Sequence, residues 1–328
     1  MNPLKHLFSL VSRLPFETYD RGQLVDERGQ FQWRPPRDFP LVIKLTSFSA
    51  RQPAPPLTWH EYLEIFIPMG NRCVMQVGNS TVELAAGDVL VMDNLKLHAL
   101  RDFDGPRLRA IVVRFLPDLI YSMGSFSIDH LFCVPFFHQV EGHPHVVRTG
   151  SEVTPRLYTV LGQLIECYFD SSGQPYSQVG AKVYFLETLY HLARHFQVSE
   201  TLYSEYLLHR ESSYRLRKLF DYTAVHYAEK ITVSQAAALV GMSRRRFLEL
   251  FKTMGNLTWV EYLNDVRLNA AALLIKQGKY SIAEIAIRIG YSDQSYLNRR
   301  FKQRFGHTPL EFRKLAGGLG FGAVAEGK

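Results

Sequence analysis

The sequence predicts an α+β protein of several domains: a β-rich N-terminal domain, a helical pair and an all-α C-terminal region. Three observations support this prediction. Residues from about 41 to 117 form short runs of β-branched and aromatic side chains separated by turn residues. From about Ser151 onward, apolar side chains recur at helical spacing. The last third of the chain also contains a helical unit that is repeated after about 50 residues.

Composition indicates a globular protein of the cytosol. The 328 residues are enough for two or three domains, and 46% of them are hydrophobic, which allows a sizeable core. The three cysteines are too few and too scattered for a disulfide framework or a zinc knuckle, as expected in a reducing compartment. The N-terminus has no clean signal-peptide pattern, and no run of about 18 apolar residues occurs. We therefore predict a cytoplasmic protein without a membrane partner.

Positive charge is concentrated in the C-terminal third of the chain. Residues 211–328 contain 19 Lys and Arg against 10 Asp and Glu, a net charge of +9, whereas residues 1–210 carry −2. A basic segment of this kind suits a polyanionic partner, although a solvated basic surface would give the same count. Charge alone leaves both interpretations open.

The first 150 residues are predicted to form one β-rich domain with an N-terminal arm. Four segments have the composition of short strands and are bounded by turn residues: LEIFIPMG, RCVMQVG, STVELAAGDVLVMD and RLRAIVVRFLP. Several short strands at close spacing are typical of a sandwich or a barrel. His60 and Glu64 are four residues apart, so on a strand both side chains would face the same side.

Residues 151–198 are predicted to form an antiparallel helix pair. The segments TPRLYTVLGQLIECYF and AKVYFLETLYHLARHF have helical periodicity, and Ser-Ser-Gly-Gln-Pro separates them. The pair is a candidate dimerisation element, but its leucines would equally well pack it onto the β-rich domain; they are Leu157, Leu161, Leu164, Leu186 and Leu189. Residues 199–213 are the expected linker, residues 214–316 the C-terminal domain and residues 317–328 a flexible tail.

A weak internal repeat predicts two helix-turn-helix units in tandem. The segment TVSQAAALVGMS (232–243) aligns with SIAEIAIRIGYS (281–292), so that Gly241 falls on Gly290. Each unit has a short helix ending at a glycine, where the chain turns sharply, and then a second helix. A long helical segment, about 259–277, joins the two units.

The second helix of each unit has one apolar and one polar face. The apolar side chains are predicted core residues: Phe247, Leu250, Phe251 and Met254 in the first unit, and Leu297, Phe301 and Phe305 in the second. The opposite faces carry side chains that match base edges or phosphates. The predicted DNA-binding residues are Arg244, Arg245, Leu248, Glu249, Lys252, Gln294, Ser295, Asn298, Arg299 and Lys302. Two such helices in one chain favour double-stranded DNA as the partner over a merely solvated surface.

The segment GYSDQSYLNRRFKQRFGHTPLEFR resembles the C-terminal signature of the AraC/XylS family of bacterial transcription regulators. The matching positions are Gly290, Tyr291, Asp293, Tyr296, Phe301, Lys302, Gly306, Thr308 and Pro309, within a resemblance that spans about residues 214–315. Leu297 stands where many members have phenylalanine, and Glu249 where many carry arginine. The run Arg244-Arg245-Arg246 offers a compensating positive charge at the start of that helix. The resemblance implies a homodimeric transcription regulator that also contacts RNA polymerase.

The same resemblance implies a jelly-roll cupin sensor in the N-terminal domain. WHEYLEIFIPMG and AAGDVLVMDNLKLHAL are similar to the two cupin motifs, which assigns His60, Glu64 and His98 to the lining of an effector site. In metal-binding cupins two or three histidines and a glutamate hold the ion, but Thr58 occupies the place of the first motif histidine here. We therefore predict a polar pocket for a small effector, with no metal and no cofactor. Family precedent leans towards a sugar.

A second class of function remains open from the sequence. A metal-dependent cupin enzyme with a DNA-binding tail would use the same three side chains, and metal analysis would separate the two. No Ser-His-Asp set, phosphate loop or cofactor fingerprint is evident elsewhere in the sequence. The chain is therefore expected not to be an enzyme.

Overall fold

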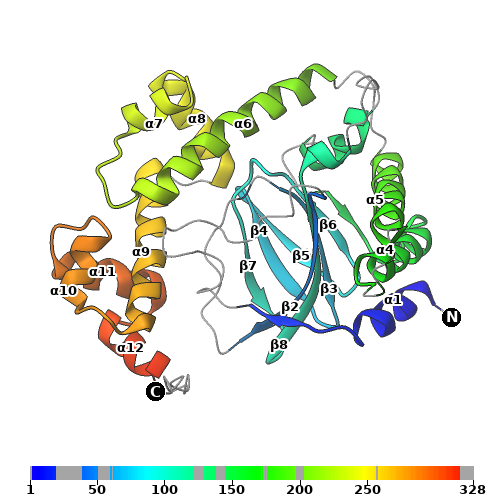
Figure 1. Ribbon diagram of the computed structural model, residues 1–328, viewed down its shortest axis with the longest axis horizontal. Helices are drawn as coiled ribbons and strands as arrows, with labels where there is room; N and C mark the ends of the chain where they lie inside the picture. Colours follow the sequence, from blue (N-terminus) through cyan, green and yellow to red (C-terminus); the bar gives the residue numbers. More distant parts are fainter. Residues whose placement is uncertain are drawn as a thin grey trace. The chain divides into compact units, whose positions relative to one another are not determined.

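The chain divides into two compact units in the computed structural model (Figure 1). The described residues are 2–19, 39–50, 60, 62–120, 129–137, 145–170, 172, 174, 176–196, 203–255 and 258–317. The first unit extends along the chain to Arg217, and Lys218 opens the main part of the second. Thr58, residues 199–202, the tail beyond 317 and the side chain of Met254 lie outside the described part of the chain.

The described strands of the N-terminal unit form two sheets. One has six strands in the order β1-β2-β8-β3-β6-β9, and the other has three in the order β5-β4-β7. The strands are β1 (Glu17–Thr18), β2 (Leu41–Ser49), β3 (Leu63–Met69), β4 (Cys73–Val77), β5 (Ser80–Leu84), β6 (Val89–Met92), β7 (His98–Phe103), β8 (Arg107–Phe115) and β9 (Val146–Val147). All neighbouring pairs are antiparallel except β1 and β2. The register places Glu64 on β3 directly opposite Arg114 on β8.

The six-stranded sheet is buried on both faces. On one face, side chains such as Phe66 and Val112 pack against Met75 and Leu100 of the three-stranded sheet. The other face packs against α1 (Pro3–Val11), α4 (Thr154–Tyr168) and α5 (Tyr176–His195). Because both faces are covered, all seven residues of β3 are buried, and the alternation expected of a half-exposed strand is absent from its sequence.

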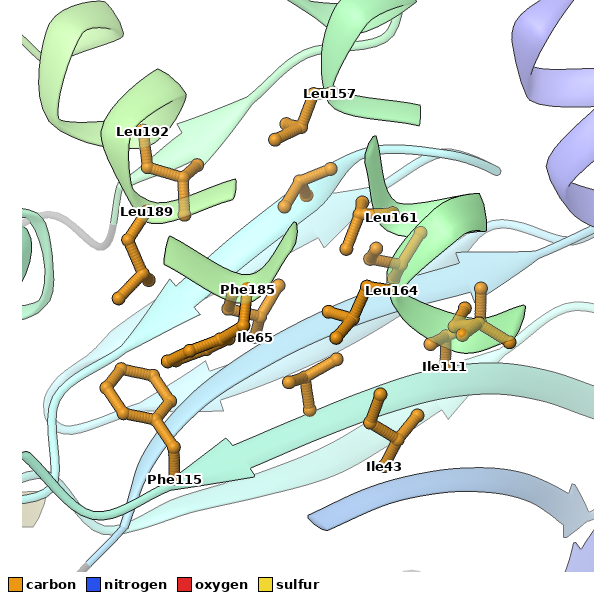
Figure 2. Close-up of a cluster of buried hydrophobic side chains, with 14 of the residues drawn as sticks. Ile43, Ile65, Ile111, Phe115, Leu157, Leu161, Leu164, Phe185, Leu189 and Leu192 are labelled. Atoms are coloured by element: carbon orange, nitrogen blue, oxygen red, sulfur yellow. The ribbon is translucent and has the colours of Figure 1, made fainter. Parts of the chain in front are cut away.

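The leucines of the helix pair point at the sheet. Leu157, Leu161 and Leu164 on α4 and Leu189 on α5 are fully buried against strand residues that include Ile65, as Figure 2 shows. Leu186 is partly buried against the same cluster. Burying one such side chain contributes about 1.5–3 kcal/mol. These leucines therefore pack the pair onto the sheet, which is one of the two roles that the sequence left open for them.

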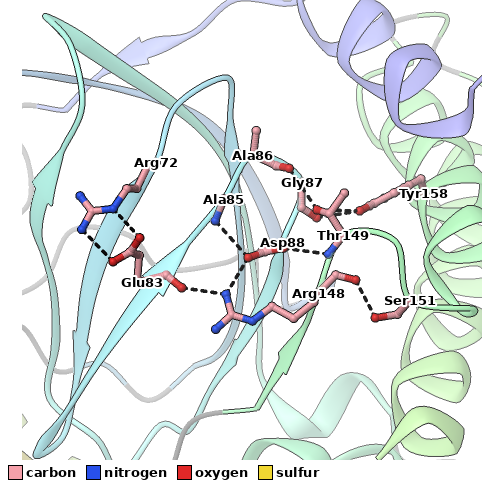
Figure 3. A network of polar contacts seen from close by, with 10 residues as sticks. All are labelled: Arg72, Glu83, Ala85, Ala86, Gly87, Asp88, Arg148, Thr149, Ser151 and Tyr158. Atoms are coloured by element: carbon pink, nitrogen blue, oxygen red, sulfur yellow. Dashed lines mark hydrogen bonds and ion pairs between the residues drawn. The ribbon is translucent and has the colours of Figure 1, made fainter.

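A polar network fastens α4 to the turn between β5 and β6 (Figure 3). Asp88 is buried and accepts hydrogen bonds from the backbone N–H of Thr149 at 2.8 Å and from Arg148 Nη1 at 2.7 Å. Tyr158 of α4 donates its hydroxyl to the carbonyl of Gly87 at 2.9 Å. Burial alone would raise the pKa of Asp88, but the hydrogen bonds to its carboxylate outweigh burial and lower the pKa. The ionised carboxylate thus anchors this corner of the unit.

The C-terminal unit is helical throughout its described elements. They are α6 (Tyr203–His226, of which 203–217 belong to the first unit), α7 (Val233–Leu239), α8 (Arg244–Gly255, of which 253–255 are grouped with the first unit), α9 (Trp259–Gln277), α10 (Ile282–Arg288), α11 (Gln294–Phe305) and α12 (Pro309–Gly317). The predicted connecting helix is confirmed as α9. The segment expected to be a linker, 199–213, is helical from Tyr203 onward, where it forms the first part of α6. None of the helices described here combines the length and apolar character that a membrane span requires.

Local sequence signals fix where these helices begin. Three capping boxes open α7, α9 and α10, formed by Thr232 with Gln235, Thr258 with Glu261, and Ser281 with Glu284. Trp259, at the start of α9, is fully buried, and its ring packs against the rings of Phe247 and Phe251. Its indole N–H donates to the carbonyl of Ile231 at 2.9 Å, which ties α9 to the segment before α7.

Candidate nucleic-acid interface and candidate effector site

The first helix-turn-helix unit consists of α7, a glycine turn and α8. Gly241 has a φ of 63°, a left-handed conformation that glycine adopts without strain. Phe247 and Phe251 of α8 are buried as predicted, and Leu250 is half-buried. The buried aromatic face holds α8 against the unit and leaves the opposite face in solvent.

The second unit repeats this arrangement with α10 and α11. Gly290 has a φ of 82°, and a Cβ built on it would lie 2.0 Å from the backbone oxygen of Ala228. Asp293 caps α11 by accepting from the backbone N–H of Tyr296 at 2.8 Å. The predicted core residues Leu297, Phe301 and Phe305 are all buried.

The polar faces of α8 and α11 are open to solvent. The residues predicted to bind DNA are all exposed except Asn298, which is half-buried: Arg244, Arg245, Leu248, Glu249, Lys252, Gln294, Ser295, Arg299 and Lys302. Arg245 Nε donates to Glu249 Oε1 at 2.9 Å, and the Arg299 guanidinium lies 5.4 Å from the centre of the Tyr296 ring. Both faces thus offer guanidinium and ammonium donors, with an amide or carboxylate acceptor, at helical spacing.

A cluster of buried charged and imidazole side chains lies in the N-terminal unit. His60, Glu64 and His98 are only 3%, 2% and 4% exposed, and one ligand atom from each lies within 4.8 Å of the others. His60 Nε2 is 2.9 Å from Glu64 Oε2, and His98 Nε2 is 3.8 Å from the same oxygen. The structure therefore brings together the three residues that the sequence singled out.

The reason that His60 meets Glu64 differs from the predicted one. The sequence argument placed both residues on one strand, but β3 begins only at Leu63, so His60 precedes it. The imidazole turns back to the strand, where Nδ1 lies 3.1 Å from the carbonyl oxygen of Tyr62. The two side chains meet through the lead-in to the strand and not through strand periodicity.

Sequence reasoning missed the fourth member of the cluster, Arg114. Its Nε donates to Glu64 Oε2, the oxygen that also contacts His60, and the residue is only 9% exposed. The pairing follows from the register of β3 with β8, which sets residues about fifty positions apart side by side. A signal was present, because Arg114 is the single charged residue inside the apolar run 110–116.

Burial and the neighbouring charges determine which groups of the cluster are ionised. Burial, with the nearby Arg114 charge, lowers the pKa of His60 to about 3, and burial also lowers the pKa of His98. Burial alone would raise the pKa of Glu64, but the Arg114 charge and the His60 contact outweigh it and lower that pKa well below its usual range. At neutral pH the cluster therefore holds an ionised carboxylate, a guanidinium and two neutral imidazoles.

Comparisons with known proteins identify the C-terminal unit. A family model described as a helix-turn-helix domain matches residues 236–315, which include α8, α9, α10 and α11. The uncharacterised HTH-type transcriptional regulator YdeC of Bacillus subtilis is 22% identical, over 79% of this chain and 86% of YdeC. The HTH-type transcriptional activator RhaR of Mannheimia succiniciproducens is 26% identical, over 80% of this chain and 88% of RhaR. Residues 236–315 are thus a helix-turn-helix domain of the AraC type.

The fold of the chain is similar to that of a solved protein. ToxT from Vibrio cholerae, in a crystal structure with an unsaturated fatty acid bound, has a TM-score of 0.50 and 13% identity, covering 90% of this chain and 100% of ToxT. The likeness concerns the fold alone: an N-terminal sheet domain followed by a helical helix-turn-helix region.

Residues that match the AraC signature end α11 and start α12. Gly306 terminates the helix with a φ of 76°, and Thr308 donates its backbone N–H to Glu311 at 2.8 Å where α12 begins. The rings of Phe301, Phe305 and Phe312 then pack together. Leu297, a departure from the family pattern, is fully buried among the core residues, so a leucine fills that place.

Proposed function

We propose that the chain is a cytoplasmic, effector-responsive regulator that binds double-stranded DNA as a homodimer and acts together with RNA polymerase. The observation that supports DNA binding is duplication: α8 and α11 each bury an aromatic face and expose a polar face with basic side chains. One amphipathic basic helix is often just a solvated surface, whereas two in matched helix-turn-helix units favour recognition of two grooves.

In this proposal each second helix enters a major groove. Arg245 and Arg299 are the candidate guanine readers, because a guanidinium matches O6 and N7 of guanine with two parallel hydrogen bonds. Lys252 and Lys302 are candidate phosphate contacts. The 19-residue helix α9 is about 28 Å long at 1.5 Å per residue, comparable with the roughly 34 Å between successive major grooves on one face of the duplex.

Footprinting of the full-length protein tests this geometry. We expect each chain to protect two blocks of contacts separated by about one helical turn, or 10.5 base pairs. Arg245→Ala and Arg299→Ala should each weaken one block and leave the other in place, so each variant is the matched control for the other. A wild-type footprint with a single block per chain would contradict the proposal.

We propose that His60, Glu64 and His98 contact the effector, inside a jelly-roll cupin formed by the two sheets. Their burial, and the ionised carboxylate among them, support a ligand that donates hydrogen bonds, such as the hydroxyl groups of a sugar. The ToxT structure holds a fatty acid, but in this chain Glu64 would repel a second carboxylate. YdeC and RhaR are named as transcriptional regulators, and we propose a binding role for this cluster in place of a catalytic one.

A thermal-shift screen that includes both sugars and fatty acids tests the effector class. A ligand at 100 times its dissociation constant adds about 2.7 kcal/mol of stability. Glu64→Gln should preserve DNA binding without effector and weaken the effector response, whereas His6→Ala, an exposed histidine on α1, should change neither. An unchanged response of Glu64→Gln would place the effector elsewhere.

The homodimer is proposed to form through the outward face of α5. Tyr176, Val179, Val183 and Tyr190 are 77%, 60%, 56% and 46% exposed, and their spacing of three, four and seven residues is that of a coiled-coil seam. A continuous apolar stripe on a helix that already buries its other face suits a second copy of the same helix.

A further inference from the structure

The segment that joins α6 to α7 is tied to α9 at two points. At the start of α9, the indole N–H of Trp259 donates to the carbonyl of Ile231. Eight residues later, or about 12 Å along the helix, Arg267 donates from Nε to the carbonyl of Tyr227 and from Nη2 to that of Glu229, both at 2.7 Å. The two carbonyls lie just beyond the end of α6, and one guanidinium holds both because its donors are fixed in a planar fork.

The same arginine lies against the turn of the second helix-turn-helix unit. The Arg267 guanidinium is 5.7 Å from the centre of the Tyr291 ring, within the range of a cation–π contact, and Tyr291 is only 5% exposed. The Tyr291 hydroxyl donates to Asn264 Oδ1 of α9 at 3.3 Å. The neighbouring Gly290 packs on the backbone of Ala228, which lies between the two residues whose carbonyls bind Arg267. Arg267 therefore lies where the α6–α7 segment, α9 and the second turn meet.

Contacts extend from this junction towards the exposed faces of both units. The Tyr291 ring meets the ring of Tyr296 edge to face, with centroids 4.9 Å apart, and Tyr296 lies in the first turn of α11. The Arg299 guanidinium lies 5.4 Å from the centre of the Tyr296 ring. In the other direction, the segment that Arg267 binds runs into α7, and the glycine turn at Gly241 connects α7 to α8. Arg267 is thus linked to the helices that carry both polar faces.

We propose that Arg267 is a positioning residue that holds α8 and α11 at a fixed mutual orientation, an inference that rests on the proposed two-groove binding of DNA. The helix α9 by itself would be an axis about which each unit could turn. The bonds of Arg267 to residues 227 and 229, together with its contact with Tyr291, oppose that rotation. Two linked readers gain affinity only when both engage at once, and a preformed orientation avoids the entropy cost of ordering them on the DNA.

Two substitutions of Arg267 separate positioning from charge. Arg267→Ala removes the charge and the hydrogen bonds together. Arg267→Lys keeps the charge and a long stem, but an ammonium is a point donor without the planar fork that spans two carbonyls and lies against a ring. Lys276→Ala is the matched control, because it removes the same charge from an exposed position in the last turn of the same helix.

Binding of the full-length protein to duplexes of altered spacing tests the proposal. The duplexes carry the two contact blocks of one chain, as mapped by footprinting, either at their native separation or with two base pairs inserted, which rotates one block by about a fifth of a turn. For wild type and Lys276→Ala the insertion should weaken binding at least about tenfold, because the second unit misses its groove. Both Arg267 variants should bind the native duplex at least about tenfold more weakly than wild type, and the insertion should then cost them less than about threefold.

The ratio of the two affinities distinguishes positioning from stability. A variant that merely unfolds more readily loses the same factor on both duplexes and keeps the wild-type ratio, and that result would overturn the proposal. If Arg267→Ala loses its helical circular dichroism, the ratio for Arg267→Lys decides. A wild type that protects two blocks but tolerates the insertion would refute the fixed orientation alone, whereas protection of a single block would refute the two-groove binding on which it rests.

Discussion

Replacing Gly290 with alanine should destabilise the second helix-turn-helix unit. The loss should exceed that at a glycine of the same backbone conformation whose Cβ would meet no neighbour. The residue has a φ of 82°, which costs an L-amino acid about 1–2 kcal/mol. The new Cβ would also lie 2.0 Å from the Ala228 backbone oxygen and 2.6 Å from its carbonyl carbon, so the backbone must move. We expect a total loss of about 3–5 kcal/mol, a large share of the 5–15 kcal/mol that stabilises a typical domain.

Gly306→Ala is the matched control for this prediction. Gly306 has a φ of 76° and nothing within 4 Å of a built Cβ, so the substitution carries the same backbone strain without the collision. Urea denaturation of both full-length variants, followed by helical circular dichroism, should show Gly290→Ala less stable by about 2–3 kcal/mol. Equal stabilities would refute the steric argument, because they would mean that the backbone around Ala228 shifts at little energetic cost.

Three further predictions concern DNA reading, the Asp88 anchor and the dimer. Arg299→Ala should cost about 1–3 kcal/mol of binding free energy at one base position. Lys302→Ala should weaken binding to all sequences alike and reduce the slope of log affinity against log salt concentration by about one. Binding to cognate and scrambled duplexes at several salt concentrations checks both, and equal losses for Arg299→Ala on the two duplexes would indicate a backbone contact. Asp88→Asn should lower the unfolding free energy by about 1–3 kcal/mol at neutral pH. Because folding lowers the pKa of Asp88, its stabilisation is present above the ordinary value of 3.8 and is lost as the pH falls through the lower folded value, so urea denaturation across this range should show the two proteins converge. Val183→Lys should shift the protein to monomer in sedimentation, whereas Gln178→Lys, exposed on another side of α5, should not; an intact dimer with Lys at position 183 would exclude the seam.

The C-terminal unit was predictable because its signals are local. Glycine turns, capping residues and helical periodicity all act within a few residues, and they place α8, α9 and α11 close to their observed bounds. The same logic failed at 199–213, where polar composition predicted a linker and α6 begins at Tyr203. Polar side chains do not prevent a helix, and this segment has neither glycine nor proline.

The N-terminal site was only partly predictable because strand register is a long-range property. The resemblance to the cupin motifs grouped His60, Glu64 and His98, which the structure brings together, whereas Arg114 joined them through pairing between β3 and β8. Nothing near either strand in the sequence specifies that pairing. The role of the helix-pair leucines was undecidable for the same reason, since periodicity gives a helix an apolar face but does not name the surface that covers it.

Aligned by their core residues, the two second helices differ at the centre of their exposed faces. Phe251 and Lys252 of α8 correspond to Phe301 and Lys302 of α11, which sets Glu249 at the place of Arg299. The offset is 50 residues here but 49 between the glycines, so the second turn is one residue longer.

The difference between Glu249 and Arg299 predicts that the two helices prefer different bases. Glu249 presents an acceptor, and it also bonds Arg245 one turn earlier, with the two side chains 62% and 90% exposed. An exposed ion pair of this kind stabilises a helix by only about 0.3–0.5 kcal/mol. Breaking it on binding to DNA would therefore cost little free energy. A guanidinium at the centre of α11 favours guanine, whereas a carboxylate at the centre of α8 favours the amino group of cytosine or, through Arg245, a neighbouring guanine. The two contact blocks of one chain should therefore differ in sequence, and an operator built of two identical blocks would contradict this assignment of the faces.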